Sequence, residues 1–158
     1  MSPSTDEVAI WQRRLASQAN NRAWTLAESL SRTPEEDEEM MHAAHAAMYF
    51  WKIVGNARNQ AHAAQLVAHV FALLGLGRPA QHYQAKSQPM LLSEGAETWE
   101  QAMAHAVAAN VAAANNDTKA HSEHYSQAVR LMNSLTDADR KVLDATLRVV
   151  PQPKGVET

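Results

Sequence analysis

Apolar residues recur at intervals of three and four along nearly the whole chain, which is the spacing of amphipathic α-helices. Strand-like alternation and long linkers are absent from the pattern. The expected helices are residues 6–30, as one bent helix or two short ones, then 34–54, 57–74, 79–89, 93–114, 118–132 and 137–150. The pattern predicts an all-α protein of about seven or eight helices, in a single domain spanning residues 1–158.

Two segments repeat the same arrangement at a separation of about 40 residues. Each has an apolar helix, a break of small or polar residues, and a second helix containing a His-Tyr or similar pair. The first copy covers residues 68–85 and breaks at Gly75-Leu76-Gly77, and the second covers residues 107–128 and breaks at Asn115-Asn116. This spacing is typical of stacked helical hairpins, and such arrays usually bind other molecules.

The clearest helix start in the sequence is Thr33-Pro34-Glu35-Glu36. Threonine is a good N-cap, proline suits the first helical position, and the glutamate three residues after the threonine completes a capping box. Asp117 and Thr136 are expected to cap the last two helices in the same way. These signals predict where the helices begin.

Several segments resemble tetratricopeptide-like helix pairs. The positions that carry the resemblance are Leu74-Gly75, Pro79-Ala80 and Tyr83, together with residues 21–30 leading to Thr33. More closely, residues 34–51 and 58–75 are similar to an uncharacterised bacterial family of tetratricopeptide-like proteins, and the similarity extends over most of residues 30–135. The resemblance implies a right-handed array of antiparallel helix pairs, an α-α superhelix, and brings no assigned activity.

Composition and charge narrow the functional classes. The net charge is −3 and no basic stripe is visible, which argues against nucleic-acid binding. No stretch approaches the roughly 18 apolar residues of a membrane span. Because the chain has no cysteine and no signal-peptide pattern, we expect a cytoplasmic protein. Residues 1–5 and 152–158 are expected to be disordered.

One polar stripe contains side chains that could bind a metal ion. Glu38, His42, His45 and Tyr49 follow one another at offsets of three and four on one expected helix. The next helix runs antiparallel, so His69 is expected near the level of His42. If these sides face each other, the glutamate and the three histidines could bind a metal ion. Alternatively, the histidines fill space at helix contacts and have only a structural role.

The leading functional prediction is a non-enzymatic module that binds a protein or peptide through the first helix of each pair. The predicted binding residues are His42, His45, Tyr49, His62, Gln65, His69, Gln101 and His105, with Asn110 beside them. No catalytic residue and no cofactor is predicted. A homodimer is also expected as an option, through a Trp11/Leu15 or a Leu143/Leu147 stripe. The alternative function is a small-ligand or metal-binding helical protein, including an enzyme, built on the histidine cluster.

Overall fold

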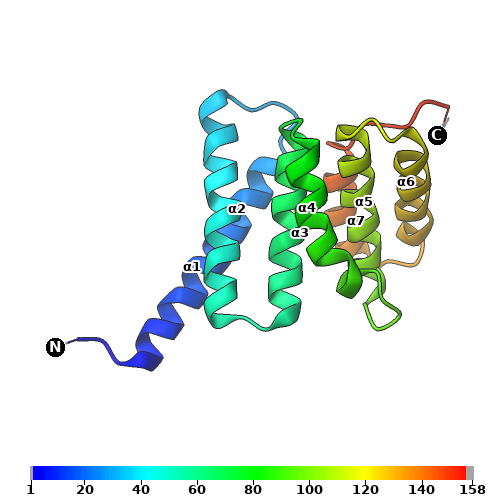
Figure 1. The fold of residues 1–158 in the computed structure, drawn as a ribbon. Coiled ribbons are helices and arrows are strands. Elements are labelled where there is room, and N and C mark those ends of the chain that lie inside the picture. The colour runs from blue at the N-terminus through cyan, green and yellow to red at the C-terminus, as the bar shows by residue number, and fades with distance from the viewer. Residues whose placement is uncertain (1, 156–158) are drawn as a thin grey trace.

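The computed structural model describes residues 2–155, and all regular structure in this range is α-helical. Seven helices occur in these residues: α1 (Thr5–Ala27), α2 (Pro34–Val54), α3 (Ala57–Leu73), α4 (Gly77–Leu91), α5 (Thr98–Ala114), α6 (Thr118–Met132) and α7 (Asp137–Leu147) (Figure 1). The all-α class is therefore confirmed. Residues 1 and 156–158, part of the termini predicted to be disordered, lie outside the described range.

The helix starts that the sequence marked are present. The Thr33 hydroxyl accepts the N–H of Glu36 at 3.2 Å, and the Glu36 carboxylate accepts the N–H of Thr33 at 2.9 Å, which completes the capping box. Asp117 and Thr136 accept the expected backbone N–H groups at the starts of α6 and α7. These predictions are confirmed because an N-cap depends on residues only three positions apart.

Some helix boundaries differ from the prediction. Of the two alternatives predicted for residues 6–30, the single helix is present, because Asn20 and Asn21 continue it, but it ends at Ala27. The helix predicted to begin at residue 93 begins at Thr98, where Glu97 and Glu100 form a second capping box. The Ser93 hydroxyl instead donates a hydrogen bond to the carbonyl of Met90, at the end of α4.

The other differences are small. Helix α4 starts at Gly77, two residues before Pro79, and continues past Pro89 to Leu91. A proline late in a helix removes one backbone donor but does not prevent a final turn from forming. Helix α7 ends at Leu147, before the predicted residue 150.

The two predicted breaks adopt the same backbone turn. Gly75 has φ of 74°, and the following N–H of Leu76 donates to the carbonyl of Phe71 at 2.9 Å. Asn116 has φ of 58°, and the N–H of Asp117 donates to the carbonyl of Ala112 at 2.9 Å. Both are Schellman motifs, in which a left-handed residue lets the chain satisfy the last helical carbonyls. The two breaks of the sequence repeat are thus structurally equivalent.

The helices pack as consecutive pairs. The most extensive contacts join α1 with α2, α3 with α4, and α5 with α6. Further contacts join α2 with α3, α4 with α5, α1 with α3, α3 with α5, and α5 with α7. Helices α3 and α5 therefore lie in the middle of the molecule (Figure 1). Their many alanines allow this, since a side chain that ends at Cβ lets helix axes approach closely. Leu143 and Leu147 of α7 are buried in this core, so they cannot form the predicted dimer contact.

The first half of α1 stands apart from the packed helices (Figure 1). All described residues from 2 to 11 are exposed, and Trp11 is 60% exposed. The helix joins the body at Arg13, whose guanidinium donates to the carbonyl of Val54 at 2.8 Å and lies over the ring of Trp51. None of the described helices is long and apolar enough to cross a membrane.

Candidate functional site

A groove of about 890 Å³ lies between α2 and α4, with α3 beneath it. Its surroundings are predominantly apolar and aromatic, with histidine and lysine side chains among them. The lining residues are His45, Met48, Tyr49, Lys52, Ala57, Gln60, Ala61, Ala64, His82, Tyr83, Lys86, Pro89 and Met90. A cavity of this size is large enough for a drug-sized molecule or for several side chains of a partner.

The depth of the groove follows from the sequence of α3. Ala57, Ala61 and Ala64 succeed one another at offsets of four and three, so they share one face of the helix. Larger residues occupy the facing sides of α2 and α4, while these alanines end at Cβ. The three alanines therefore form a low floor between two higher walls.

One end of the groove is held by stacked rings. Tyr83 of α4 lies nearly parallel to Phe71 of α3, with 5.7 Å between ring centroids. The His45 ring meets both rings edge-on, and its Nδ1 is 2.9 Å from the carbonyl of Met41, to which it donates. Edge-to-face and stacked aromatic pairs each add about 0.5–1.5 kcal/mol beyond burial. These contacts fix the positions of His45 and Tyr83 before any ligand binds.

The charged side chains that line the groove are both positive. Lys52 and Lys86 are both exposed, and no carboxylate belongs to the described lining. Tyr49 is 62% exposed, which leaves a large amphipathic ring open to a partner. The site can therefore bury apolar groups along its floor and pair an anionic group with a lysine at its rim.

The predicted polar stripe of α2 is divided by the fold. His45 and Tyr49 line the groove, whereas Glu38 and His42 are exposed on the same helix outside it. His69 lies elsewhere, in the core. In the part of the chain that the structure describes, no three His, Asp or Glu side chains are close enough to hold a metal ion. The predicted convergence of Glu38, His42, His45 and His69 is therefore wrong.

Gln65 and His69 are buried between helices, so the prediction that they line an accessible face is also wrong. His69 stacks on Trp24 of α1 at 5.5 Å, and its Nδ1 accepts the side-chain amide of Asn110 at 3.1 Å. Burial, with a smaller contribution from the positive charge of Arg32, lowers the pKa of His69 to about 3. Within residues 2–155, His69 Nε2 and Gln65 Oε1 have no hydrogen-bond partner. His69 is consequently a neutral core residue.

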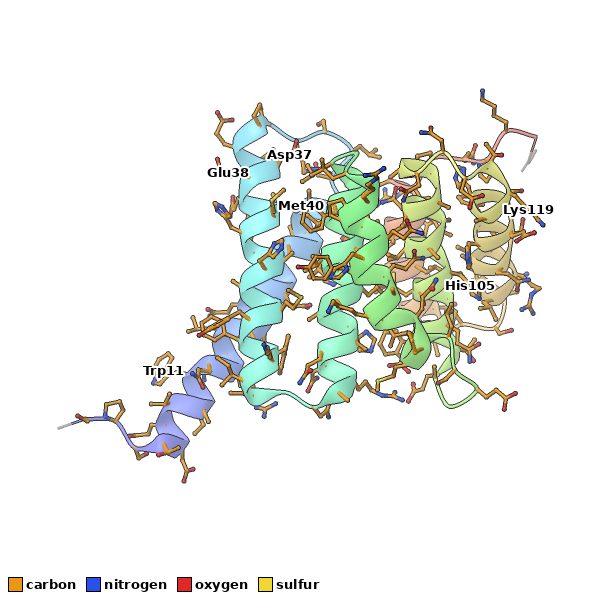
Figure 2. All side chains as sticks on the ribbon, viewed as in Figure 1. Trp11, Asp37, Glu38, Met40, His105 and Lys119 are labelled. Atoms are coloured by element: carbon orange, nitrogen blue, oxygen red, sulfur yellow. The ribbon has the colours of Figure 1, made fainter. Side chains whose placement is uncertain are left out.

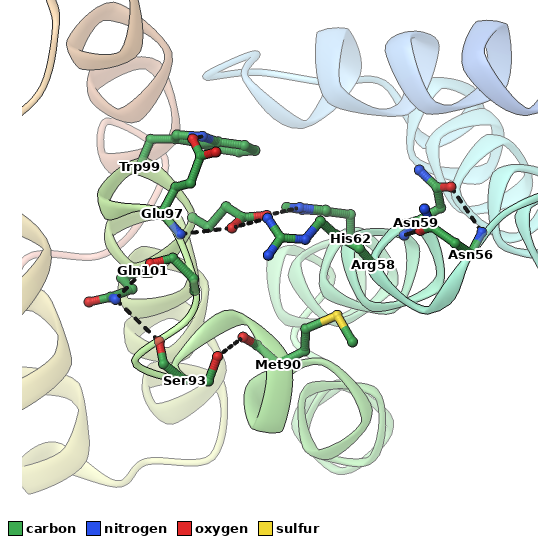
Figure 3. A network of polar contacts seen from close by, with 11 residues as sticks. Asn56, Arg58, Asn59, His62, Met90, Ser93, Glu97, Trp99 and Gln101 are labelled. Carbon is green, nitrogen blue, oxygen red and sulfur yellow. Dashed lines mark hydrogen bonds and ion pairs between the residues drawn. The ribbon is translucent and has the colours of Figure 1, made fainter.

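His62 belongs to a polar network that joins α3 to the start of α5 (Figure 3). Its Nε2 is 2.7 Å from one oxygen of the buried Glu100 carboxylate, and the Arg58 guanidinium donates to the other oxygen at 2.8 Å. Trp99 stacks on the imidazole, with the ring planes only 7° apart. The contacts of His62 and Arg58 with Glu100 connect α3 to the first turn of α5.

The Glu100 carboxylate is stabilised in its charged form. Burial raises its pKa, but the hydrogen bond from the N–H of Glu97 and the contacts with His62 and Arg58 outweigh burial, and the pKa falls below the ordinary value. A carboxylate with several donors behaves in this way because the donors favour the anion. The network is therefore intact at neutral pH.

Gln101 and His105 also make contacts within the chain. The Gln101 amide donates to the carbonyls of Ser93 and Ala96, which holds the segment between α4 and α5. His105 and His124 bring their Nδ1 atoms within 2.9 Å of each other, between α5 and α6. Burial, followed by the charges of His124 and Arg130, lowers the pKa of His105 to about 4. Figure 2 shows His105 on the opposite side of the molecule from Glu38.

Sequence reasoning missed most of the groove. Lys52, Tyr83 and Lys86 were not predicted to be functional, although a signal was present. Segment 45–52 carries a histidine, a tyrosine and a lysine at offsets of four and three, and segment 82–90 carries the same three residue types, with its histidine and tyrosine adjacent. A comparison of these two segments with each other, instead of a search for metal ligands, would have indicated that both belong to one site.

Comparisons of the chain with protein-family models, curated proteins and solved structures gave no match. The fold and the groove geometry therefore carry the functional argument by themselves.

Proposed function

We propose that this protein is a tetratricopeptide-like interaction module whose groove between α2 and α4 binds a short amphipathic segment of a partner protein. The bound segment has apolar side chains that reach the alanine floor and an acidic residue that pairs with Lys52 or Lys86. The class of function is the one predicted from the sequence, but the binding site is not on the first helix of each pair. The site lies on the second helices of two successive pairs, with α3 between them, and includes His45 and Tyr49.

The observation that carries the proposal is the preformed apolar groove with charges of a single sign. Amphipathic segments commonly bind by laying an apolar face into a groove between helices. Large rings and flexible methionines provide most of the binding energy in such sites. The groove offers exposed Tyr49 together with Met48 and Met90, while its lysines select against basic partners.

The tetratricopeptide-like part of the proposal rests on two regularities. Equivalent helices of successive pairs contact each other, α1 with α3 and α3 with α5. Equivalent positions of the two sequence repeats also contact each other. The side-chain amide of Asn110 donates a hydrogen bond to His69, which lies 41 residues earlier in the chain. Such near-neighbour stacking is the property that defines helical-repeat proteins.

The proposal can be tested by selecting binders from a displayed library of random short peptides. We expect enriched peptides with apolar residues at helical offsets and at least one acidic residue. Lys86→Glu should weaken their binding about tenfold or more, which corresponds to about 1.4 kcal/mol or more. Lys141→Glu, on the exposed side of α7, is the matched control and should bind normally. Peptides that bind both variants equally would refute the site.

The groove volume also suits a small amphipathic anion, which corresponds to the alternative function predicted from the sequence. Anilinonaphthalene sulfonate is a suitable probe because it is apolar and negatively charged. If no peptide is enriched, but this probe binds the protein and loses affinity with Lys86→Glu, a small-ligand function replaces the peptide-binding one.

A further inference from the structure

We infer that the partner of the groove is a second copy of this chain, which inserts the projecting first half of its α1. Two copies exchange these segments reciprocally, and each groove is complete only with the helix of the other copy. The inference rests on the proposed function, because it names the segment that the groove binds. We call residues 4–12, which precede the attachment at Arg13, the arm.

The arm presents exposed apolar groups, of which only the Trp11 ring has a charged neighbour, the guanidinium of Arg14 at 5.2 Å. Val8, Ile10 and Trp11 are between 38% and 60% exposed. Figure 2 shows Trp11 on the part of α1 that extends away from the other helices. Large apolar side chains clustered on one exposed segment mark a contact surface rather than ordinary surface residues.

The arm is built as a preformed helix. Ser4 and Glu7 form a capping box, in which the Glu7 carboxylate accepts the N–H of Ser4 at 2.7 Å. A separate helix of fewer than about twelve residues is at most marginally stable in water, so a free peptide of this sequence would lose conformational entropy on binding. The arm avoids most of this cost, because it continues a helix whose other half is packed on α2.

The arm cannot enter the groove of its own chain. Helix α1 is continuous through Ala27, and Arg13 ties it to Val54 and Trp51 at the end of α2. From that point the arm leads away from the body (Figure 1). Folding it back over α2 would require breaking the helix, which makes a second molecule the only source of this segment.

The charges and shapes of the arm and groove are complementary. The arm carries the acidic residues Asp6 and Glu7, and the groove carries Lys52 and Lys86, while Arg13 and Arg14 lie where α1 joins the body. Val8 and Trp11 lie three residues apart on one face of the arm, and Leu15 continues this apolar stripe just beyond Arg13. A groove between two helices accepts such a stripe.

The positions of arm and groove favour a two-fold dimer. The arm leaves the body beside Val54, only two residues after the groove residue Lys52. When both features lie at the same end of the molecule, one two-fold rotation can place each arm on the other groove. Reciprocal exchange doubles the buried area, which helps to reach the roughly 1,000 Å² of a specific interface.

Disulfide cross-linking tests the arrangement directly, because the natural chain has no cysteine. A copy with Val8→Cys is mixed with a differently tagged copy with Met90→Cys and oxidised. We expect a disulfide between the two copies. The control pairs Val8→Cys with Lys141→Cys, which lies on α7, and should give none. A Val8→Cys copy that cross-links as readily to the control, or only to itself, would overturn the inference.

Charge reversal provides a second test through the mass in solution. The natural protein should sediment as a dimer, Lys86→Glu should dissociate at least tenfold more readily, and adding Asp6→Lys to Lys86→Glu should restore the dimer. A natural protein that is monomeric at its highest soluble concentration would overturn the inference. If selected peptides still bind the groove of that monomer, the proposed function stands without it, whereas failure of both measurements removes both.

Discussion

The buried histidine of the core makes the stability of this protein depend on pH in a calculable way. His69 has a pKa of about 3 in the folded protein and about 6.5 when unfolded. Below pH 6.5 the unfolded chain takes up a proton that the folded chain refuses, so stability falls as the pH falls. Each pH unit between these values costs about 1.36 kcal/mol, which amounts to about 2.7 kcal/mol at about pH 4.5.

The test compares the natural protein with His69→Gln by urea unfolding, followed by circular dichroism, in steps from about pH 7 to about pH 4. Glutamine does not titrate and can still accept the Asn110 amide. Because the stack on Trp24 is lost, we expect the variant to be about 1–2 kcal/mol less stable at pH 7. Its stability should then decline less steeply with acid, so the two curves should cross between about pH 5 and about pH 6, and the variant should be the more stable protein at about pH 4.5.

Other titratable groups contribute equally to the pH dependence of stability in the natural protein and in His69→Gln, so their effect cancels in the comparison. The pKa of His105 is also lowered by burial, so this histidine destabilises both proteins alike as the pH falls. His42→Gln, at an exposed position on α2, is the matched control and should follow the natural protein over the whole range. If His69→Gln and the natural protein show parallel curves, His69 is not held neutral in the core and the reasoning is refuted.

Two further predictions concern packing between helices. Glu100→Gln should lower the free energy of unfolding by about 2 kcal/mol at pH 7, because hydrogen bonds to a charged group are lost, although exposure of Arg58 limits the effect. Since the pKa of Glu100 is lowered by folding, the deficit should shrink as the pH falls through that value, and an unchanged deficit would contradict the network. Gly77→Ala should destabilise by about 1–3 kcal/mol in thermal unfolding, because its Cβ would lie 2.7 Å from the carbonyl oxygen of Ala114. A gain in stability, as helix propensity alone would give, would show that the turn can move aside.

The histidines illustrate where sequence reasoning ended. All of the site histidines were visible as polar residues on helices, yet their roles depend on which helix lies opposite. His45 packs edge-on against rings of α3 and α4, and His62 pairs with Glu100 of α5, while His69 is fully buried. The spacing of residues along one helix gives the face of a side chain but not the identity of its neighbours.

The sequence by itself determined the helical class, most of the helix starts and the two equivalent turns. These features depend on groups a few residues apart, such as Thr33 with Glu36, or on a single left-handed residue such as Gly75. Only the tertiary structure decided that α2 and α4 lie on either side of the alanines of α3. It also decided that the arm of α1 extends away from the other helices of its own chain. The reason is that grooves and exposed faces arise from the packing of helices distant in the chain, which local spacing does not encode.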